Sequence, residues 1–247
     1  MAGDGLVERF RRPAEGVERK SSDTDLVSEA DREAERTLGD LLRRERPDDG
    51  LLGEEAADES GTSGRRWIVD PLDGTTNYLY GLSAWCVSVA LEGQDGLLVG
   101  VVHDPVGGET FRAARGRGSE LNGNPLEMGG TASLEDALLA TGFGYAAEER
   151  ARQAVTFSHV ISRVRDVRRA GSAALDLAWV AAGRLDGYWE RGGKIWDWAA
   201  GRLIVAEAGG ACAFLDGEPE GLVAADPALL PEILTLLERA EASAGAN

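Results

Sequence analysis

Cysteine and histidine are scarce in this sequence. Its two cysteines, Cys86 and Cys212, lie far apart, and each belongs to an apolar segment typical of a strand. We therefore expect two free, buried thiols and neither a disulfide nor a cysteine metal site. The two histidines, His103 and His159, lie at the end of a predicted strand and on a predicted helix, where we expect structural or solvated roles.

Long hydrophobic runs are also missing. No segment approaches the ~20 consecutive apolar residues that a membrane-spanning helix needs. The N-terminal sequence MAGDGLVERFRRPAEG lacks the apolar stretch of a signal peptide. The sequence therefore predicts a cytoplasmic protein without a membrane partner.

Positive charge is in short supply. The chain has 26 Lys and Arg against 43 Asp and Glu, a formal net charge of -17. This charge repels the phosphate backbone of nucleic acids, so we expect no nucleic-acid polymer as a partner. An acidic protein with an anionic substrate needs cations at its site, and bound divalent metals would supply them.

The pattern of apolar residues predicts two parts. In residues 1–130, residues 28–45 have helical spacing, with Ser28 and Asp31 as a capping box and a helix that begins close to Asp31. Residues 50–66 are polar and glycine-containing, and they predict a loop. The short strands that follow predict an antiparallel sheet: residues 67–70, 86–92, 96–104 and 109–114.

In residues 131–247 strands and helices alternate, which favours an α/β arrangement. Strands are expected in ALLATG, LDGYWE and ACAFL. Helices are expected from about Ala147, in SAALDLAWVAAG, in DWAAGRLIVAEAGG and from about Pro227. At 247 residues the chain suits one large domain or two closely packed ones.

The segment WIVDPLDGTTNYLYG carries the densest chemical signal. A predicted strand ends at Asp70, Pro71 enforces an irregular turn, and Asp73 follows. The spacing allows both aspartates to bind one cation through hard oxygen atoms while the Leu72 carbonyl points to another, which suits Mg²⁺. Backbone N–H groups of Gly74 and Thr75 could bind phosphate.

Three other interpretations apply to parts of this segment. An isolated D-x-x-D-G can be an acidic turn that caps a helix. A calcium loop starting at Asp70 is excluded, because its third position is Leu72 and its twelfth is Gly81. The haloacid-dehalogenase signature has its nucleophilic aspartate where this chain has Pro71, which leaves direct attack by metal-activated water.

Four motifs occur in order: ERKSSDTDLVSEAD, LLGEE, WIVDPLDGTTNY and IWDWAAGRLIVAEAGG. From Glu18 to Gly210 the chain thereby resembles the inositol monophosphatase family. The resemblance implies a layered αβαβα fold, with metals between an α+β part (1–130) and an α/β part (131–247). It also implies a homodimer and two or three Mg²⁺ ions in each active site. Members usually have a longer helix before the segment that matches Glu18.

The resemblance also implies a set of metal ligands. Glu54 matches the glutamate of the first metal site, Asp70 bridges metals, and the Leu72 carbonyl is a further ligand. Asp73 and Asp197 match the carboxylates of the second site. Taken alone, Asp197 could equally cap the helix that starts there.

Catalytic roles follow for three residues by the same resemblance. Thr75 matches the threonine that holds and activates the attacking water, and Asp31 matches the aspartate hydrogen-bonded to that threonine. Glu54 is expected to be catalytic as well as a metal ligand. Lys20 matches a lysine of a mobile loop near the metals, or else is a solvated charge. Glu55 resembles Glu54 chemically but is expected to be solvated or structural.

The segment GSAALDLAWVAAGRLDGYWE resembles the substrate side of the family. Gly171, Ser172, Ala173 and Asp73 are implied near the sugar, and Glu190 would accept hydrogen bonds from its hydroxyls. A carboxylate there disfavours a second phosphate. The four tryptophans in this half are expected to pack rather than to bind sugar: Trp179, Trp189, Trp196 and Trp198.

The sequence thus predicts a Mg²⁺-dependent phosphomonoesterase that hydrolyses inositol monophosphate or a similar small polyol or sugar phosphate. The alternative is a sister phosphatase acting on histidinol phosphate, fructose 1,6-bisphosphate or a nucleotide 3′-phosphate. A metal-binding regulator without catalysis is the third hypothesis, against which the full set of matched ligands argues.

Overall fold

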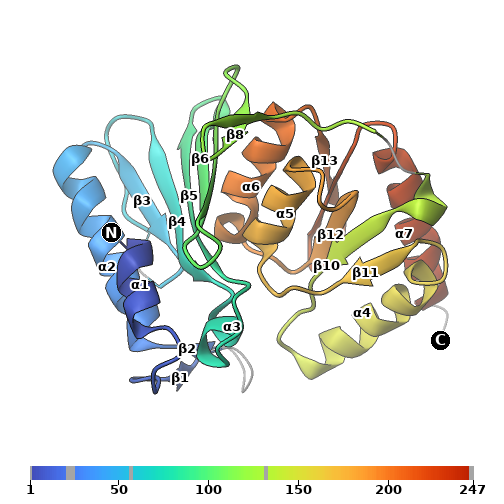
Figure 1. The fold of residues 1–247 in the computed structure, drawn as a ribbon, viewed down its shortest axis with the longest axis horizontal. Coiled ribbons are helices and arrows are strands. Elements are labelled where there is room, and N and C mark those ends of the chain that lie inside the picture. The colour runs from blue at the N-terminus through green and yellow to red at the C-terminus, as the bar shows by residue number, and fades with distance from the viewer. Residues whose placement is uncertain (1, 21–25, 56–57, 131–132, 245–247) are drawn as a thin grey trace.

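The computed structural model describes residues 2–20, 26–55, 58–130 and 133–244. Helices and sheets alternate in five layers, α, β, α, β and α, from one side of the molecule to the other (Figure 1). This arrangement confirms the predicted layered fold. Part of the ERKSSDTDLVSEAD motif, residues 21–25, lies outside the described residues.

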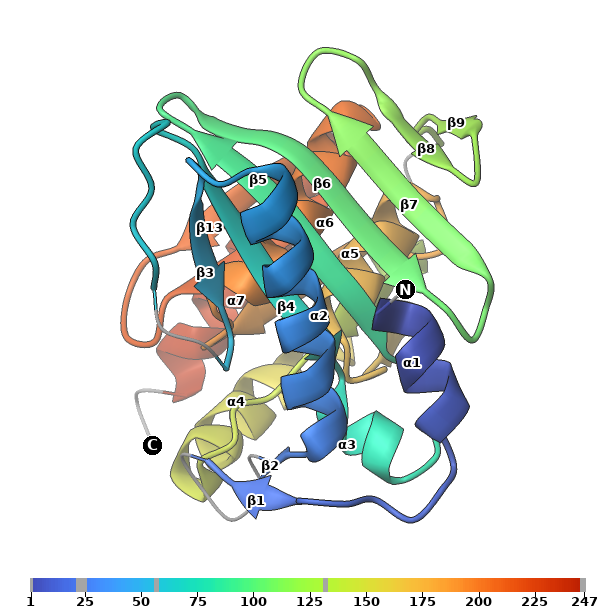
Figure 2. The same cartoon turned by 90° about the vertical axis from the view of Figure 1, so that its left-hand side faces the viewer.

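The first layer consists of α1 (Ala2–Arg9) and α2 (Glu29–Glu45), which lie across one face of a sheet (Figure 2). Helix α2 begins at Glu29, two residues before the predicted start. Its cap is the predicted one, because Asp31 Oδ2 accepts a hydrogen bond of 2.9 Å from the Ser28 backbone N–H. Helix α1 is short and buries Leu6.

The second layer is a seven-stranded sheet in which neighbours in sequence are neighbours in space. All its pairs are antiparallel except that of β3 and β4. Its strands are β3 (Gly50–Gly53), β4 (Arg66–Asp73), β5 (Cys86–Gly93), β6 (Gly96–Asp104), β7 (Glu109–Ala114), β8 (Ser119–Leu121) and β9 (Asn124–Leu126). The prediction of a loop over residues 50–66 is wrong at its start, because Leu51 is buried and pairs with Trp67.

The middle layer consists of α5 (Ala173–Ala181) and α6 (Ile195–Glu207), which pack between the two sheets (Figure 1). Both helices are apolar on most sides, as a helix covered on two faces must be. Gly100 of β6 allows α6 to come close, because a Cβ at this position would lie 2.7 Å from the Ala200 carbonyl oxygen.

The second sheet has the order β11-β10-β12-β14-β13. Strand β10 is parallel to β11 and β12, and the other pairs are antiparallel. The strands are β10 (Leu138–Thr141), β11 (Asp166–Arg168), β12 (Gly187–Arg191), β13 (Ala211–Leu215) and β14 (Gly221–Ala225). The predicted alternation of strands and helices is confirmed.

Helices α4 (Ala147–Val160) and α7 (Leu230–Ala244) form the last layer. Helix α4 begins at the predicted residue, whereas α7 begins three residues after Pro227 because a turn comes first. Ile233 and Leu237 of α7 are buried against the sheet. No helix within the described ranges is long and apolar enough to cross a membrane.

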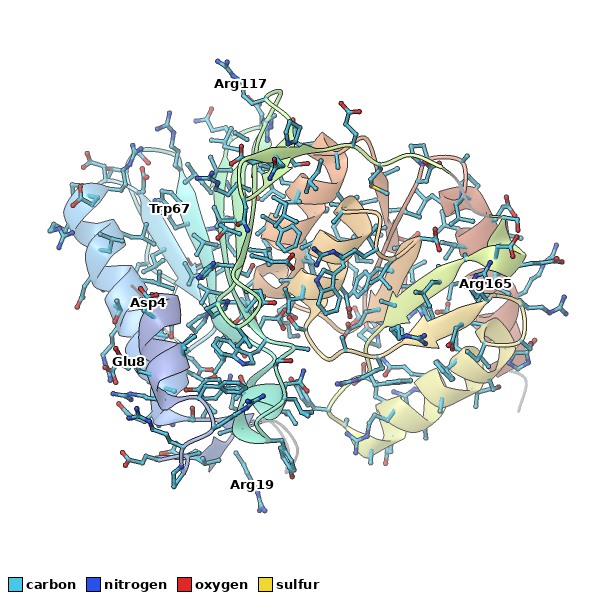
Figure 3. All side chains as sticks on the ribbon, viewed as in Figure 1. Asp4, Glu8, Arg19, Trp67, Arg117 and Arg165 are labelled. Atoms are coloured by element: carbon cyan, nitrogen blue, oxygen red, sulfur yellow. The ribbon has the colours of Figure 1, made fainter. Side chains whose placement is uncertain are left out.

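Four small elements complete the chain: β1 (Glu18–Arg19), β2 (Leu26–Val27), α3 (Thr75–Leu79) and the 3-10 helix η1 (Leu134–Asp136). Strand β1 pairs with β2 near the N-terminal end of α2 (Figure 2). Arg19 points away from the protein (Figure 3). Lys20, the next residue, contacts Glu54, and both side chains are partly buried.

Candidate active site

An irregularity at the end of β4 places two aspartates on the same side of the sheet. Asp70 pairs with Ser88 and Asp73 pairs with Cys86, so three steps on β4 match two steps on β5. Pro71 has no N–H for the ladder, which favours a bulge here. One extra residue reverses the alternation of side chains, and Asp70 and Asp73 are both buried. Strand β4 therefore continues past Asp70, where the sequence predicted its end.

Glu54 follows β3, the parallel neighbour of β4, and Lys20 binds it. Lys20 Nζ lies 2.7 Å from Glu54 Oε1 and also contacts Glu55 Oε1. Burial of Lys20 opposes its charge, but Glu54 and Glu55 outweigh burial and raise the pKa of Lys20. Glu55 is thus a structural ion-pair partner and not a solvated residue, since its side chain is 13% exposed.

The carboxylates near this point repel one another. Burial raises the pKa of Asp70 well above its usual value, and the charges of Glu54, Asp73 and Asp197 add to the effect. Burial also raises the pKa of Asp73, to about 6, although hydrogen bonds from the α5 end lower it. Lys20 is the cation that the structure pairs with Glu54. Such buried negative charge fits hard divalent cations, which prefer oxygen ligands.

These carboxylates are not already arranged as a metal site. Among the residues that the structure describes, no three Asp, Glu, His or Cys side chains are grouped as metal ligands. Lys20 lies on Glu54, and Asp197 Oδ2 accepts a hydrogen bond of 2.6 Å from the Lys194 backbone N–H. The predicted capping role of Asp197 is therefore present, and it leaves the other carboxylate oxygen available.

Thr75 is held by the start of α2. Its hydroxyl lies 2.8 Å from Asp31 Oδ1 and 3.1 Å from the Leu72 carbonyl oxygen. Asp31 is fully buried and also accepts from the hydroxyl and the backbone N–H of Ser28. Because both neighbours of Thr75 are acceptors, its hydroxyl hydrogen points toward them and its oxygen can accept from a further molecule.

Two glycines let the two halves of the protein meet beside Thr75. Gly74 has φ +95°, and a Cβ there would lie 2.9 Å from the Ala84 oxygen and 3.2 Å from the Gly171 oxygen. Gly171 has φ +92°. Both positions therefore favour glycine on conformational grounds. Asn77 of α3 joins the segments through hydrogen bonds to the carbonyls of Ala84 and Ala170.

The N-terminal end of α5 binds Asp73. Asp73 Oδ2 accepts hydrogen bonds of 2.7 Å from the Ser172 hydroxyl and from the Ala174 backbone N–H. A carboxylate is favoured at this position because the helix dipole is positive at its N-terminus. Ser172 also caps the helix by accepting from Leu175 N–H.

Glu190 faces the site from β12. Tyr188 donates a hydrogen bond of 2.8 Å to its Oε2. Burial raises the pKa of Glu190 to about 7, and the Asp73 charge contributes. The neighbouring Arg191 points to the other side of the sheet, where Glu241 binds it with two hydrogen bonds.

A cavity of about 540 Å³ connects these elements. It is lined by most of the predicted residues: Lys20, Glu54, Asp73, Gly171, Ser172, Ala173, Glu190 and Asp197. Five predicted residues do not line the cavity: Asp31, Asp70, Leu72, Gly74 and Thr75. Thr75 is hydrogen-bonded to Asp31 and Leu72, and the charges of cavity residues act on Asp70. The lining also contains residues that the sequence did not single out: Glu149, Arg169, Asp176 and Lys194.

Other polar residues lie outside the cavity, as expected. His103 is hydrogen-bonded to Thr110, and His159 to the Val155 carbonyl within its own helix. Both cysteines are free. Cys86 is buried, but Cys212 is partly exposed because it lies on the edge strand β13, so the prediction of burial is wrong for Cys212.

The chain is similar to proteins of known class over nearly its whole length. The family model described as "Inositol monophosphatase family" matches residues 1–242. An inositol-1-monophosphatase of Rhizobium meliloti is 48% identical over 75% of this chain and 71% of that protein. Inositol-1-monophosphatase SuhB of Mycobacterium tuberculosis is 44% identical over 90% and 81%. A crystal structure of the extragenic suppressor protein suhB from Bartonella henselae superposes with a TM-score of 0.90 at 38% identity, covering 96% of this chain and 93% of that one.

The layered α/β fold and the cavity lined by carboxylates are those of a phosphatase, as the family model and the solved structure indicate. The chain belongs to the inositol monophosphatase family. It is therefore a hydrolase that acts on small phosphorylated substrates.

Proposed function

We propose that this chain is a Mg²⁺-dependent phosphomonoesterase whose substrate is inositol monophosphate or a similar small polyol or sugar phosphate. The observation that supports it most is a group of carboxylates that act on one another at the end of β4. Burial raises the pKa of Asp70, and the charges of Glu54, Asp73 and Asp197 add to this; burial also raises the pKa of Asp197, and the charges of Asp73 and Glu54 add to it. The names of the relatives, inositol-1-monophosphatases, support the substrate class.

The proposed cation ligands are these four carboxylates and the Leu72 carbonyl, with two or three Mg²⁺ ions in the site. When bound, such cations stabilise the charge of the phosphoryl group and lower the pKa of a water molecule. Lys20 would give up part of its contact with Glu54 to them.

Thr75, Asp31 and Glu54 would position the attacking water. Asp31 keeps the Thr75 hydroxyl hydrogen directed toward itself, so that the Thr75 oxygen would accept a hydrogen bond from the water and orient the water's lone pair. Gly74 and Thr75 would offer backbone N–H groups to the phosphate at the start of α3. No protein nucleophile is required, because Pro71 occupies the place of an aspartyl nucleophile.

The sugar would lie across Asp73, Gly171, Ser172 and Ala173, with Glu190 as an acceptor for its hydroxyls. Residues 1–130 and 131–247 would form two subdomains that close around it, and we further propose a homodimer. Gel filtration with light scattering would test the dimer.

Phosphate release from a substrate panel, with Mg²⁺ and with EDTA, tests the proposed function. The panel is inositol 1-phosphate, histidinol phosphate, fructose 1,6-bisphosphate and adenosine 3′-phosphate. We expect the highest kcat/KM for inositol 1-phosphate and no turnover in EDTA. A preference for another member would support the sister-phosphatase alternative, and absence of Mg²⁺-dependent turnover on all four would contradict the proposal.

A further inference from the structure

Asp176 is a buried residue, and one oxygen of its carboxylate has no hydrogen-bond partner among the described residues. It is 1% exposed, and its Oδ1 atom is enclosed with no donor in reach. The rest of α5, AAL before it and LAWVA after it, is uncharged. Buried polar atoms are hydrogen-bonded in the great majority of cases, because an unpaired one loses its contacts with water. The position of Asp176 therefore needs an explanation.

Its location supplies one, since Asp176 lines the cavity that Ser172 and Glu190 also line. Ser172 is the N-cap of α5 and Asp176 lies four residues further on, so both lie on the same side of the helix. Ser172 donates a hydrogen bond to Asp73, at the proposed phosphate side. Burial is the largest influence on the pKa of Asp176, and among the neighbouring charges that of Glu190 is the largest. Helix α5 thus spans the cavity from the proposed cation site to the wall that Glu190 forms.

A role in stability alone explains the position poorly. Asp176 lies in the first turn of α5, where the helix dipole favours negative charge, and Arg169 attracts it. Burial nevertheless raises the pKa of Asp176 well above its usual value, and the charges of Glu190 and Asp73 add to this. Neither the dipole nor Arg169 gives Oδ1 a hydrogen bond.

We propose that Asp176 is a specificity-determining residue which, together with Glu190, receives hydroxyl groups of the substrate's leaving group. This inference rests on the proposed function and narrows it. Two carboxyl groups from different elements, α5 and β12, match a leaving group with at least two hydroxyls. The substrate class is thus the monophosphate of a polyol with neighbouring free hydroxyls.

The test compares Asp176→Ala with the parent on two substrates, in Mg²⁺. Inositol 1-phosphate carries hydroxyls, whereas 4-nitrophenyl phosphate has none on its leaving group. We expect kcat/KM to fall about 10- to 100-fold for inositol 1-phosphate, since hydrogen bonds to charged groups have this effect, and less than about 3-fold for the aryl ester. The melting temperature of Asp176→Ala should be higher than that of the parent, because the substitution removes a buried carboxylate with an unpaired oxygen. A residue needed only for folding would not combine lost selectivity with gained stability.

Two further variants keep the result interpretable. Asp176→Asn retains the shape and one acceptor, so it should lose selectivity in the same direction but less, and it replaces Asp176→Ala if that variant fails to fold. Asp104→Ala is the matched control: Asp104 is also buried, at 7% exposed, but accepts from Val106 and Gly107 N–H outside the cavity. It should lower the melting temperature and leave the ratio of the two kcat/KM values unchanged.

The outcomes separate this inference from the proposed function. If the parent hydrolyses inositol 1-phosphate and both Asp176 variants keep its substrate ratio, the role of Asp176 is overturned and the proposed function stands. Equal losses on both substrates also overturn it, since Asp176 then supports the site as a whole. If the parent hydrolyses only the aryl ester, the proposed function fails, and the assignment of Asp176 to polyol hydroxyls fails with it.

Discussion

Ser172, in the C-terminal half, donates its hydroxyl hydrogen to Oδ2 of Asp73, in the N-terminal half, over 2.7 Å. The two residues are 99 positions apart in the chain. This contact fixes a proposed metal ligand to the start of a helix in the other half. The site therefore depends on how the halves pack, and not only on the motif around Asp73.

Ser172→Ala tests this contact. The variant loses the hydrogen bond to Asp73 and the cap of α5, which together are worth about 1–2 kcal/mol, or about 3–6 °C in melting temperature for a chain of this size. We expect kcat/KM to fall about 10-fold, since a misplaced ligand weakens transition-state binding. Ser172→Thr keeps the hydroxyl and should retain most of both quantities. Parent-like activity in Ser172→Ala would show that Ala174 N–H alone holds Asp73.

Asp70→Asn and Asp73→Asn test the proposed cation ligands. Each removes an anionic ligand, so we expect activity to fall by at least about 100-fold at saturating Mg²⁺. Mg²⁺ should raise the melting temperature of the parent, because it binds only the folded state, and should raise that of the variants less. In EDTA the variants should melt no lower than the parent, since repulsion among buried carboxylates is relieved. A folded Asp70→Asn protein with parent turnover would contradict the proposed role.

Thr75→Val tests the water-positioning role of the hydroxyl. Valine keeps the shape of threonine but cannot bond to Asp31 or accept from water, so kcat should fall about 100-fold or more. Thr75→Ser restores the hydroxyl and should recover activity to within about 10-fold. If valine and serine had equal activity, the Thr75 hydroxyl would have no part in catalysis.

The pKa of Glu190 predicts how stability depends on pH. Its folded-state pKa of about 7 lies above the ordinary value of 4.5, so the folded protein binds this proton more tightly than the unfolded chain does. The free energy of unfolding should therefore fall as pH rises from the ordinary value toward the folded value. Glu190→Gln has no carboxyl group at this position, so its free energy of unfolding should not fall in this way as pH rises. In EDTA, its melting temperature minus that of the parent should increase between about pH 5 and pH 8. A difference independent of pH would show that Glu190 ionises normally in the folded protein.

The sequence predicted the regular elements well where the apolar pattern is long. Strands β5, β6 and β7 agree with it, because each predicted apolar segment extends over six or more residues. Strand β3 has four residues in a polar region, and its partner β4 decides its conformation. Such pairing is not visible in local sequence.

The candidate site was predictable where its residues form motifs. The motifs give Asp70, Asp73 and Thr75 directly, but the bulge that turns both aspartates to one side appears only in the register with β5. Asp176 was missed because a single acid inside an apolar helix carries no motif. The signal that could have found it is that it is the only charged residue of α5.

Gly100 determines how closely α6 approaches β6, because a Cβ there would collide with the Ala200 carbonyl. Asp197 lies in the first turn of α6, and β6 lies in the same sheet as Asp70. The separation of two proposed ligands of one ion cluster is thereby tied to a position that touches neither of them. A larger residue at position 100 would alter metal affinity although it does not contact the proposed ligands. A survey that chose variants by their contact with the cavity would overlook this position.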